Sequence, residues 1–566
     1  MAKKYAVPYA LSVPTGGVTL TGGRLHKAFE NNIGFLKGFD TDRMLYWYRV
    51  HKGKKAPYAP YGTGSGHFEN NLKGQTAGEF LMGACTTLLW REDDTLRAMA
   101  RELLSEMRDC MDDDGFIIPI PREEFPTKEY PNYTRAWITF GLLDAGYAGE
   151  EDAFAMAREM GDWFNCSDVL PFVKDMNLGF QGILAQTRLY DSPVGVKRDI
   201  EVARNHYEED WWLRQLIRKD HRAIYDHPGN HPHSTLLTTL EGYLDLYRAT
   251  GERLYIDAVR SALPMYEDKW QHVGGGISMC EMDTYFPGCN WLSVSRNYNE
   301  LCSTNFWVLI NQRMHRLYPD DAHYVDEMEN SLYNVLCAAQ VGTEGYHYLN
   351  FLEKHKDSRY LDRATCCAAM GTRLAGLLPQ FLYTYTEDTV YVDLYAPSTA
   401  RLPLCKIACE TDIPDGGSAR ITITAAEKPF ALKLRVPRWA AEDAVFFKNG
   451  AQAASGKPSS YVTIEVSAGD VIEVCFARGF RITHYTGAEQ VYGKKRFAVE
   501  YGPLLYAALG APNPVELSWD VTRPEEELIP AKNGIFEIQS DPFHCYMPYV
   551  DITDEPFSVY PLFPEG

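Results

Sequence analysis

Two short cysteine stretches hold the residues of this 566-residue chain that are best suited to chemistry. The first places Glu300 two residues before Cys302, and the second is the adjacent pair Cys366 and Cys367. Adjacent cysteines rarely bond to each other, because a vicinal disulfide strains the peptide between them. Three thiols and one carboxylate suit a tetrahedral Zn²⁺. If the two stretches meet in space they predict a zinc site; otherwise these cysteines are small buried hydrophobes.

Both stretches belong to a long segment with a helical pattern, from about residue 25 to residue 385. Between residues 96 and 107, and again between 236 and 247, apolar side chains recur every three or four positions, which predicts amphipathic helices. Stacked helical hairpins form either an open solenoid or a closed (α/α) barrel, and we favour the barrel. Short acidic turns separate the predicted helices at residues 91–94, 149–152, 250–253 and 319–322.

After residue 385 the hydrophobic period becomes two. Residues 420–424, 430–436 and 461–466 alternate between apolar and polar side chains, and turns rich in Gly, Pro and Asp separate them, as in a β-sandwich. We therefore predict an α+β multidomain protein, with an (α/α)6-type helical barrel followed by β-sandwich domains. Its four parts are an N-terminal segment with one short strand (1–24), the (α/α) barrel catalytic domain (25–385), a β-sandwich (386–482) and a C-terminal β-rich domain (483–566).

Composition narrows the classes of partner. The net charge of −20 argues against nucleic acid and anionic membrane surfaces. No apolar run approaches the ~20 residues that span a bilayer, and no apolar signal segment follows the lysines near the start. The odd number of cysteines, 13, and the lack of a signal segment predict a protein of the reducing cytoplasm. The 36 Tyr and 11 Trp residues suit stacking on carbohydrate, although large cores use them too.

The ordered set Glu300, Cys302, Cys366 and Cys367 resembles that of glycoside hydrolase family 127, the zinc-dependent β-L-arabinofuranosidase family. The resemblance implies a retaining exo-glycosidase that hydrolyses terminal β-L-arabinofuranosides or a related plant-derived sugar, so the expected partner is a carbohydrate substrate. Other stretches agree with the family in order and spacing along nearly the whole chain, at residues 31–49, 246–251, 332–334, 434–439 and 500–504.

The same resemblance implies roles for individual residues. Cys366 matches the family's attacking thiolate, and the four residues of the two cysteine stretches match its Zn²⁺ ligands. A bound cation keeps a coordinating thiol deprotonated at neutral pH, which makes a thiolate nucleophile coherent. Glu281 matches the family's acid/base position, with Asp283 as the fallback. The competing interpretation of Glu281 is an ordinary surface carboxylate in a loop.

The resemblance also suggests which residues contact the sugar. The family uses histidines to hydrogen-bond sugar hydroxyls, and His231 or His233 lies near one such position, in a cluster with His227. A second metal site is an alternative, and so are histidines that are simply solvated or cap the next helix. Tyr348 is a further candidate for the pocket, or else a packed core tyrosine.

Some positions depart from the family pattern. Residues 368–371 are Ala-Ala-Met-Gly, where many relatives have proline and asparagine. Gln75 and Glu79 stand where we expect more histidine character, and Arg135 occupies another expected pocket segment. An arginine there favours a carboxylated sugar, because its guanidinium pairs with a carboxylate. The reaction type is therefore better defined than the substrate.

Three functions remain open on the sequence. The first is a glycosidase with a zinc-bound thiolate nucleophile, and the second is a hydrolase in which zinc activates water while the cysteines only bind the metal. The third is a catalytically silent sugar-binding protein with a structural zinc. The β domains either bind carbohydrate or brace the barrel and mediate a homodimer, and we favour bracing.

Overall fold

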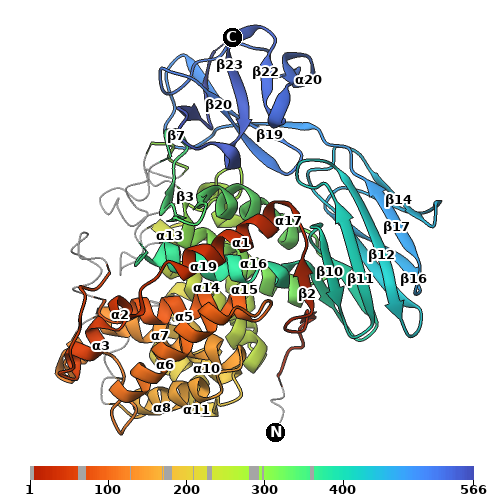
Figure 1. Cartoon of the computed structure of the whole chain (residues 1–566). Helices are drawn as coiled ribbons and strands as arrows, with labels where there is room; N and C mark the ends of the chain where they lie inside the picture. Colours follow the sequence, from red (N-terminus) through yellow and green to blue (C-terminus); the bar gives the residue numbers. More distant parts are fainter. Residues whose placement is uncertain are drawn as a thin grey trace.

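The computed structural model describes residues 5–61, 72–127, 129–167, 170, 182–207, 210–225, 233–278, 292–295, 299–356 and 363–565. Figure 1 shows a helical part, coloured red to green, beside a pair of sheets and beneath a C-terminal sheet drawn in blue. Within the described ranges, no helix is both long and apolar enough to cross a membrane.

Six helices among the described residues form a closed inner ring, in which each helix contacts the next and the last contacts the first. Helices in such a ring are enclosed on nearly all sides, and accordingly every residue of the first one is buried. In order of contact they are α5 (Gln75–Leu88), α7 (Glu129–Tyr147), α10 (Gly182–Asp191), α14 (His233–Thr250), α16 (Leu301–Leu317) and α19 (Cys366–Gly376).

A second layer of helices packs around this ring. Its members are α1 (Gly23–Lys37), α6 (Asp94–Cys110), α8 (Asp152–Cys166), α11 (Lys197–Val202), α12 (Asp210–Ile217), α15 (Arg253–Lys269) and α17 (His323–Ser331). In α6 the apolar residues predicted from spacing are buried except Met99, which is partly exposed. Asp93 caps the start of this helix by accepting bonds from the backbone N–H groups of Thr95 and Leu96. The predicted (α/α) barrel is confirmed.

The predicted acidic turns all occupy the same kind of position. Each joins an inner helix to the outer helix that follows it, as residues 91–94 join α5 to α6 and residues 319–322 join α16 to α17. Short connections of this kind make consecutive helices antiparallel. The inner helices therefore begin at the opposite end of the barrel, and Gln75, Cys302 and Cys366 lie there, in the first turns of α5, α16 and α19.

Two sheets of the described residues form the predicted β-sandwich, and their inward side chains join the core of the barrel. One has the order β1 (Leu11–Ser12), β8 (Tyr383–Tyr385), β9 (Thr389–Val392), β13 (Phe430–Val436), β16 (Ser460–Val466). The other has the order β15 (Ala451–Gly456), β14 (Ala444–Lys448), β17 (Val471–Cys475), β12 (Ser418–Ala426), β11 (Cys405–Thr411), β10 (Ser398–Arg401), β2 (Val18–Leu20).

The N-terminal segment contributes an edge strand to each sheet of the sandwich. Leu11 lies opposite Tyr385, and Thr19 lies opposite Thr399. The strand at Val18–Leu20 was predicted from its sequence, but its partner, nearly four hundred residues away, was not.

The C-terminal part is a third sheet, and one strand of the helical part joins it. Strand β7 (Glu353–Lys354), which precedes the second cysteine stretch in the sequence, pairs with β24 (Phe557–Ser558), so the sheet is tied to the barrel. Its other strands are β18 (Phe480–His484), β19 (Lys494–Tyr501), β20 (Leu504–Leu509), β21 (Leu528–Pro530), β22 (Phe536–Ile538), β23 (Asp541–Pro548), β24 (Phe557–Ser558) and β25 (Leu562–Pro564).

Candidate metal centre

The first cysteine stretch is fixed where a short strand turns into an inner helix. Strand β3 (Asn299–Glu300) pairs with β6 (Leu349–Asn350), and α16 begins directly after it. The backbone N–H of Leu301 donates to the carbonyl of Tyr348 at 3.2 Å, which holds the start of the helix against the neighbouring strand. Cys302 therefore lies in the first turn of α16.

The second cysteine stretch opens the next inner helix. Thr365 is the N-cap of α19, and its hydroxyl oxygen accepts a bond from the backbone N–H of Ala368 at 3.1 Å. Cys366 and Cys367 are consequently the first two residues of the helix. The partial positive charge at a helix N-terminus stabilises thiolates, and here two such termini meet.

The structure brings the four predicted ligands together. The carboxylate of Glu300 and the thiols of Cys302, Cys366 and Cys367 offer donor atoms that all lie within 4.8 Å of one another. The backbone N–H of Cys302 donates to Cys367 Sγ at 3.4 Å, and the same sulfur lies 3.8 Å from Glu300 Oε1. Sulfur ligands of one tetrahedral Zn²⁺ are about 3.8 Å apart, given a Zn–S bond of about 2.3 Å. The donor set and its spacing fit a metal ion.

The thiols differ in how easily they lose a proton. Hydrogen bonds to Cys302, Cys367 and Tyr348 lower the pKa of Cys366 well below its usual value. Burial raises the pKa of both Cys302 and Cys367 far above theirs. One of the three thiols therefore ionises easily. Ionising all three requires a cation beside them, because three negative charges so close together repel one another.

Two tyrosines interact with Cys366, one in contact and one through its charge. Its Sγ is 3.6 Å from the hydroxyl of Tyr348. Burial raises the pKa of Tyr133, on α7, and the charges of Cys366, Cys302 and Glu79 raise it further, so the phenol lies within electrostatic range of the thiols. The sequence analysis singled out Tyr348 but missed Tyr133. The ring centroid of Tyr133 lies 5.6 Å from that of Trp137, and nothing in this local spacing points to the distant thiols.

The carboxylate ligand is also held in place by its neighbours. The hydroxyl of Ser303 donates a bond to Glu300 Oε2, and the hydroxyl of Thr304 donates to the Glu300 carbonyl at 2.9 Å. The same Thr304 oxygen accepts from the backbone N–H of Ile277 at 3.1 Å. Ligands oriented in this way tune a metal site, yet neither hydroxyl was identified from sequence, because each residue is ordinary in a helix.

The structure says less about the other predicted site residues. Gln75 is buried at the start of α5. Arg135 is buried too, but its guanidinium lies 3.8 Å from the ring centroid of Phe164 on the outer helix α8, so it faces the space between the two helix layers. Glu281, Asp283, His227 and His231 lie outside the described residues, as does the side chain of His233, although its backbone begins α14.

Known proteins resemble the chain in sequence. Residues 17–379 match the family model "Beta-L-arabinofuranosidase, GH127 catalytic domain", and residues 389–478 match its middle domain. A non-reducing end β-L-arabinofuranosidase from Bifidobacterium longum subsp. longum is 23% identical over 298 residues. That alignment covers 49% of this chain and 45% of the relative, so the chain spans about half the length of that relative.

Solved structures resemble the chain over its whole length. A GH127 β-arabinofuranosidase matches with a TM-score of 0.74 at 19% identity, over 99% of this chain and 98% of that one. A GH127 β-L-arabinofuranosidase from Geobacillus stearothermophilus T6 matches with a TM-score of 0.75 at 15% identity, over 97% of this chain and 100% of that one. These likenesses show the fold. Because the catalytic-domain model alone matches well over half of the 566 residues, the chain belongs to glycoside hydrolase family 127.

Proposed function

We propose that the chain is a retaining exo-glycosidase that removes terminal β-L-arabinofuranosyl residues, or a related plant-derived sugar, from carbohydrates. One observation carries the proposal: three thiols and a carboxylate converge at the starts of α16 and α19 in a member of glycoside hydrolase family 127. The substrate class is that of the similar β-L-arabinofuranosidases described above. The runner-up inferred from the sequence, a carboxylated sugar paired with Arg135, is not favoured by the structure, because that guanidinium stacks on Phe164 between the two helix layers.

We assign Zn²⁺ to the four ligands Glu300, Cys302, Cys366 and Cys367. When bound, it would keep the coordinated thiols deprotonated at neutral pH. Among the three thiols, Cys366 suits the role of nucleophile, because Cys302 and Cys367 are buried while Cys366 is partly exposed. The Tyr348 hydroxyl, 3.6 Å from its sulfur, helps to hold the thiolate in position.

The reaction then has two displacements. Cys366 Sγ attacks the anomeric carbon and the bond to the leaving oxygen breaks, while the carboxylic acid of Glu281 protonates that oxygen. In the second step the Glu281 carboxylate takes a proton from water, which attacks the anomeric carbon and releases the thiolate. Each displacement inverts the anomeric carbon, so the product keeps the configuration of the substrate.

The test is a panel of terminal glycosides, including a β-L-arabinofuranoside and a uronide, followed by NMR that resolves the anomers of the first product. We expect retention, and a loss of turnover of at least about 10³-fold in Cys366→Ser and in Glu281→Gln with unchanged far-UV circular dichroism. Cys409→Ala, a buried cysteine of the sandwich, is the matched control. An inverted product would indicate attack by water, and a fully inactive panel would leave a sugar-binding protein.

A further inference from the structure

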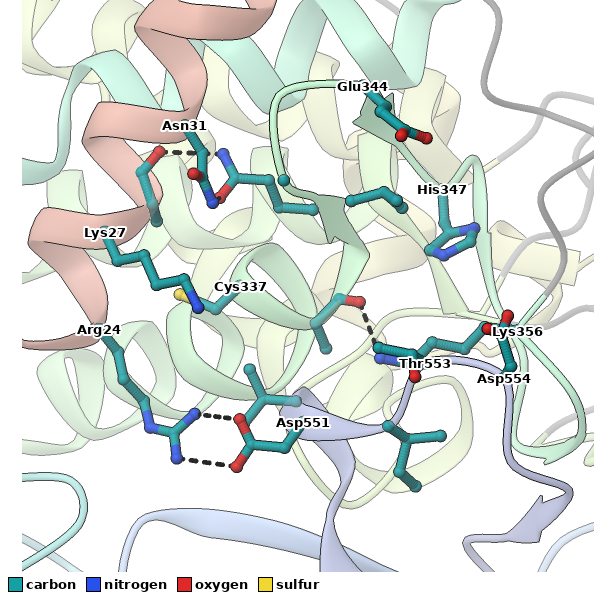
Figure 2. Close-up of a pocket in the computed structure, with 17 residues that line it drawn as sticks. Arg24, Lys27, Asn31, Cys337, Glu344, His347, Lys356, Asp551, Thr553 and Asp554 are labelled. Carbon is teal, nitrogen blue, oxygen red and sulfur yellow. Dashed lines mark hydrogen bonds and ion pairs between the residues drawn. The ribbon is translucent and has the colours of Figure 1, made fainter. Parts of the chain in front are cut away.

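A cavity of about 620 Å³ lies between the barrel and the C-terminal sheet. Figure 2 shows its walls: helix α1 on one side, the segment from α18 (Cys337–Ala339) through β4 (Gln340–Val341) to β5 (Gly345–Tyr346) on another, and the turn at residues 550–554 on a third. This volume suits a ligand of the size of a small metabolite. None of its lining residues belongs to the metal centre.

One cation of the cavity is already neutralised. The guanidinium of Arg24, on α1, donates to Asp551 at 2.6 Å and to Asp415 at 2.6 Å. Figure 2 shows Arg24 and Asp551 facing each other across one side of the cavity. This pairing ties α1 to the C-terminal part, and it leaves Arg24 no excess positive charge for a ligand.

A second cation of the cavity, Lys356, has no such partner among the residues that the structure describes. The ammonium of Lys356 donates to the carbonyl of Ala338 at 3.0 Å and lies 4.8 Å from the ring centroid of Tyr549. In the described part of the chain, no carboxylate comes within ion-pair distance of it. Burial lowers the pKa of Lys356 to about 7, although the charges of Asp551 and Glu555 act in the opposite direction. A partly buried ammonium that no counter-anion offsets is costly, and a bound anion would stabilise the charged form of Lys356.

The rim of the cavity is different in character from this inner wall. Lys27, Glu344, Thr553 and Asp554 line it and are exposed. Such a mixture of donors and acceptors suits hydroxyl groups, which can donate and accept hydrogen bonds. The inner wall thus offers Lys356, with which no described carboxylate pairs, and the entrance offers one basic side chain, two acidic ones and a hydroxyl.

We propose that this cavity binds a small polyhydroxy anion, whose carboxylate or phosphate pairs with Lys356 and whose hydroxyls reach the polar rim. The site adjoins the metal centre through one segment: His347 lines the cavity, whereas the next residue, Tyr348, lies beside Cys366. An occupied cavity therefore touches the backbone that positions Tyr348. The inference does not rest on the proposed glycosidase activity.

The experiment is isothermal titration calorimetry on the full chain with three probes: D-glucuronate, inorganic phosphate and, as the neutral control, D-glucose. We expect glucuronate to bind at least about tenfold more tightly than glucose, because a charge-assisted hydrogen bond distinguishes them. Phosphate binding alone would assign the site to phosphate esters, and glucuronate binding alone would assign it to sugar acids. Equal binding of glucuronate and glucose, or binding of neither anion, overturns the proposal.

Two variants locate the binding. Lys356→Met should weaken it at least about tenfold, whereas Lys197→Met, at a lysine whose side chain is 90% exposed on α11, should leave it unchanged. In the unmodified chain, labelling of Lys356 by acetic anhydride, followed by mass spectrometry, should slow at least threefold in saturating glucuronate. Undiminished binding in Lys356→Met places the anion elsewhere and overturns the proposal, as does a labelling rate that the ligand leaves unaltered.

Discussion

The backbone amide of Cys302 donates a hydrogen bond to the sulfur of Cys367 across 3.4 Å, although the two residues are 65 positions apart in the chain. The contact joins the first turns of two neighbouring inner helices, α16 and α19. Free N–H groups at the start of a helix point away from it, so a sulfur from the adjacent helix start is a natural acceptor. The metal centre is thus built into the rim of the barrel rather than carried by a loop.

This arrangement predicts one metal ion per chain. Protein purified under reducing conditions without added metal should contain about one equivalent of zinc, and Cys302→Ala should lose it. The reason is that a structural zinc site requires four ligands, and removing one leaves a set of three. Elemental analysis by mass spectrometry measures the content directly.

The control for this prediction is Cys409→Ala, at a cysteine buried in β11 and outside the cluster. It should keep its zinc. Full retention of zinc by Cys302→Ala, or equal loss in both variants, would contradict the assignment of Cys302 as a ligand.

The close crossing of α5 and α7 predicts a second effect. A Cβ added to Gly141 would lie 2.4 Å from the carbonyl oxygen of Gly78, a backbone atom that can only move with its helix. Gly141→Ala should therefore destabilise the protein by about 1–3 kcal/mol, despite the better helix propensity of alanine. Urea unfolding measures the change. Gly22→Ala, whose Cβ would meet Pro397 at an ordinary 3.7 Å, should change stability by less than about 0.5 kcal/mol.

Part of this fold and of its candidate site could be predicted from the sequence alone. The helical period, the acidic turns and the strand at Phe430–Val436 follow from local patterns, and the structure agrees with each. The four candidate ligands were proposed because thiols and a carboxylate in that order resemble those of the family, and the structure brings them together. Tyr133 was missed, since its proximity to Cys366 depends on how α7 packs in the ring. The edge strands of the N-terminus depend on pairings that no local pattern encodes.

A buried ion-pair group predicts a third effect, at the junction of the barrel and the sandwich. Arg435 of β13 donates to Asp326 and, at 2.6 Å, to Glu329, both on α17, and all three side chains are buried. Arg435→Met leaves two buried carboxylates without their cation, so we expect a loss of about 3–5 kcal/mol in unfolding free energy.

The matched substitution is Arg420→Met, which removes an arginine 2.6 Å from Glu473 in a pair whose side chains are 52% and 42% exposed. Water solvates that glutamate after the change, so the loss should stay below about 1 kcal/mol. Urea titrations of both variants provide the comparison. Similar losses of unfolding free energy in the two variants would mean that burial does not determine how much the Arg435 ion pairs stabilise the protein.

His272 predicts how stability changes with pH. Its ring is buried, Nδ1 lies 3.3 Å from the Tyr560 hydroxyl, and burial lowers its pKa to about 3. In the unfolded chain a histidine takes up a proton below about pH 6.5, whereas the folded protein keeps His272 neutral until about pH 3. The unfolded state therefore binds more protons between these values. Stability from this residue is fully present above pH 6.5 and falls as the pH falls, by about 1.4 kcal/mol per pH unit.

Between pH 7 and pH 5 the titration of His272 alone should lower the free energy of unfolding by about 2 kcal/mol. His272→Phe removes the titrating group. Between pH 7 and pH 5 the variant should therefore lose about 2 kcal/mol less unfolding free energy than the unmodified protein. His26→Phe, at a partly exposed histidine on α1, should follow the unmodified protein. Urea unfolding midpoints of the three proteins at both pH values measure the difference. Parallel pH profiles for His272→Phe and the unmodified chain would mean that the buried ring accepts a proton in the folded state, through relaxation that admits water to it.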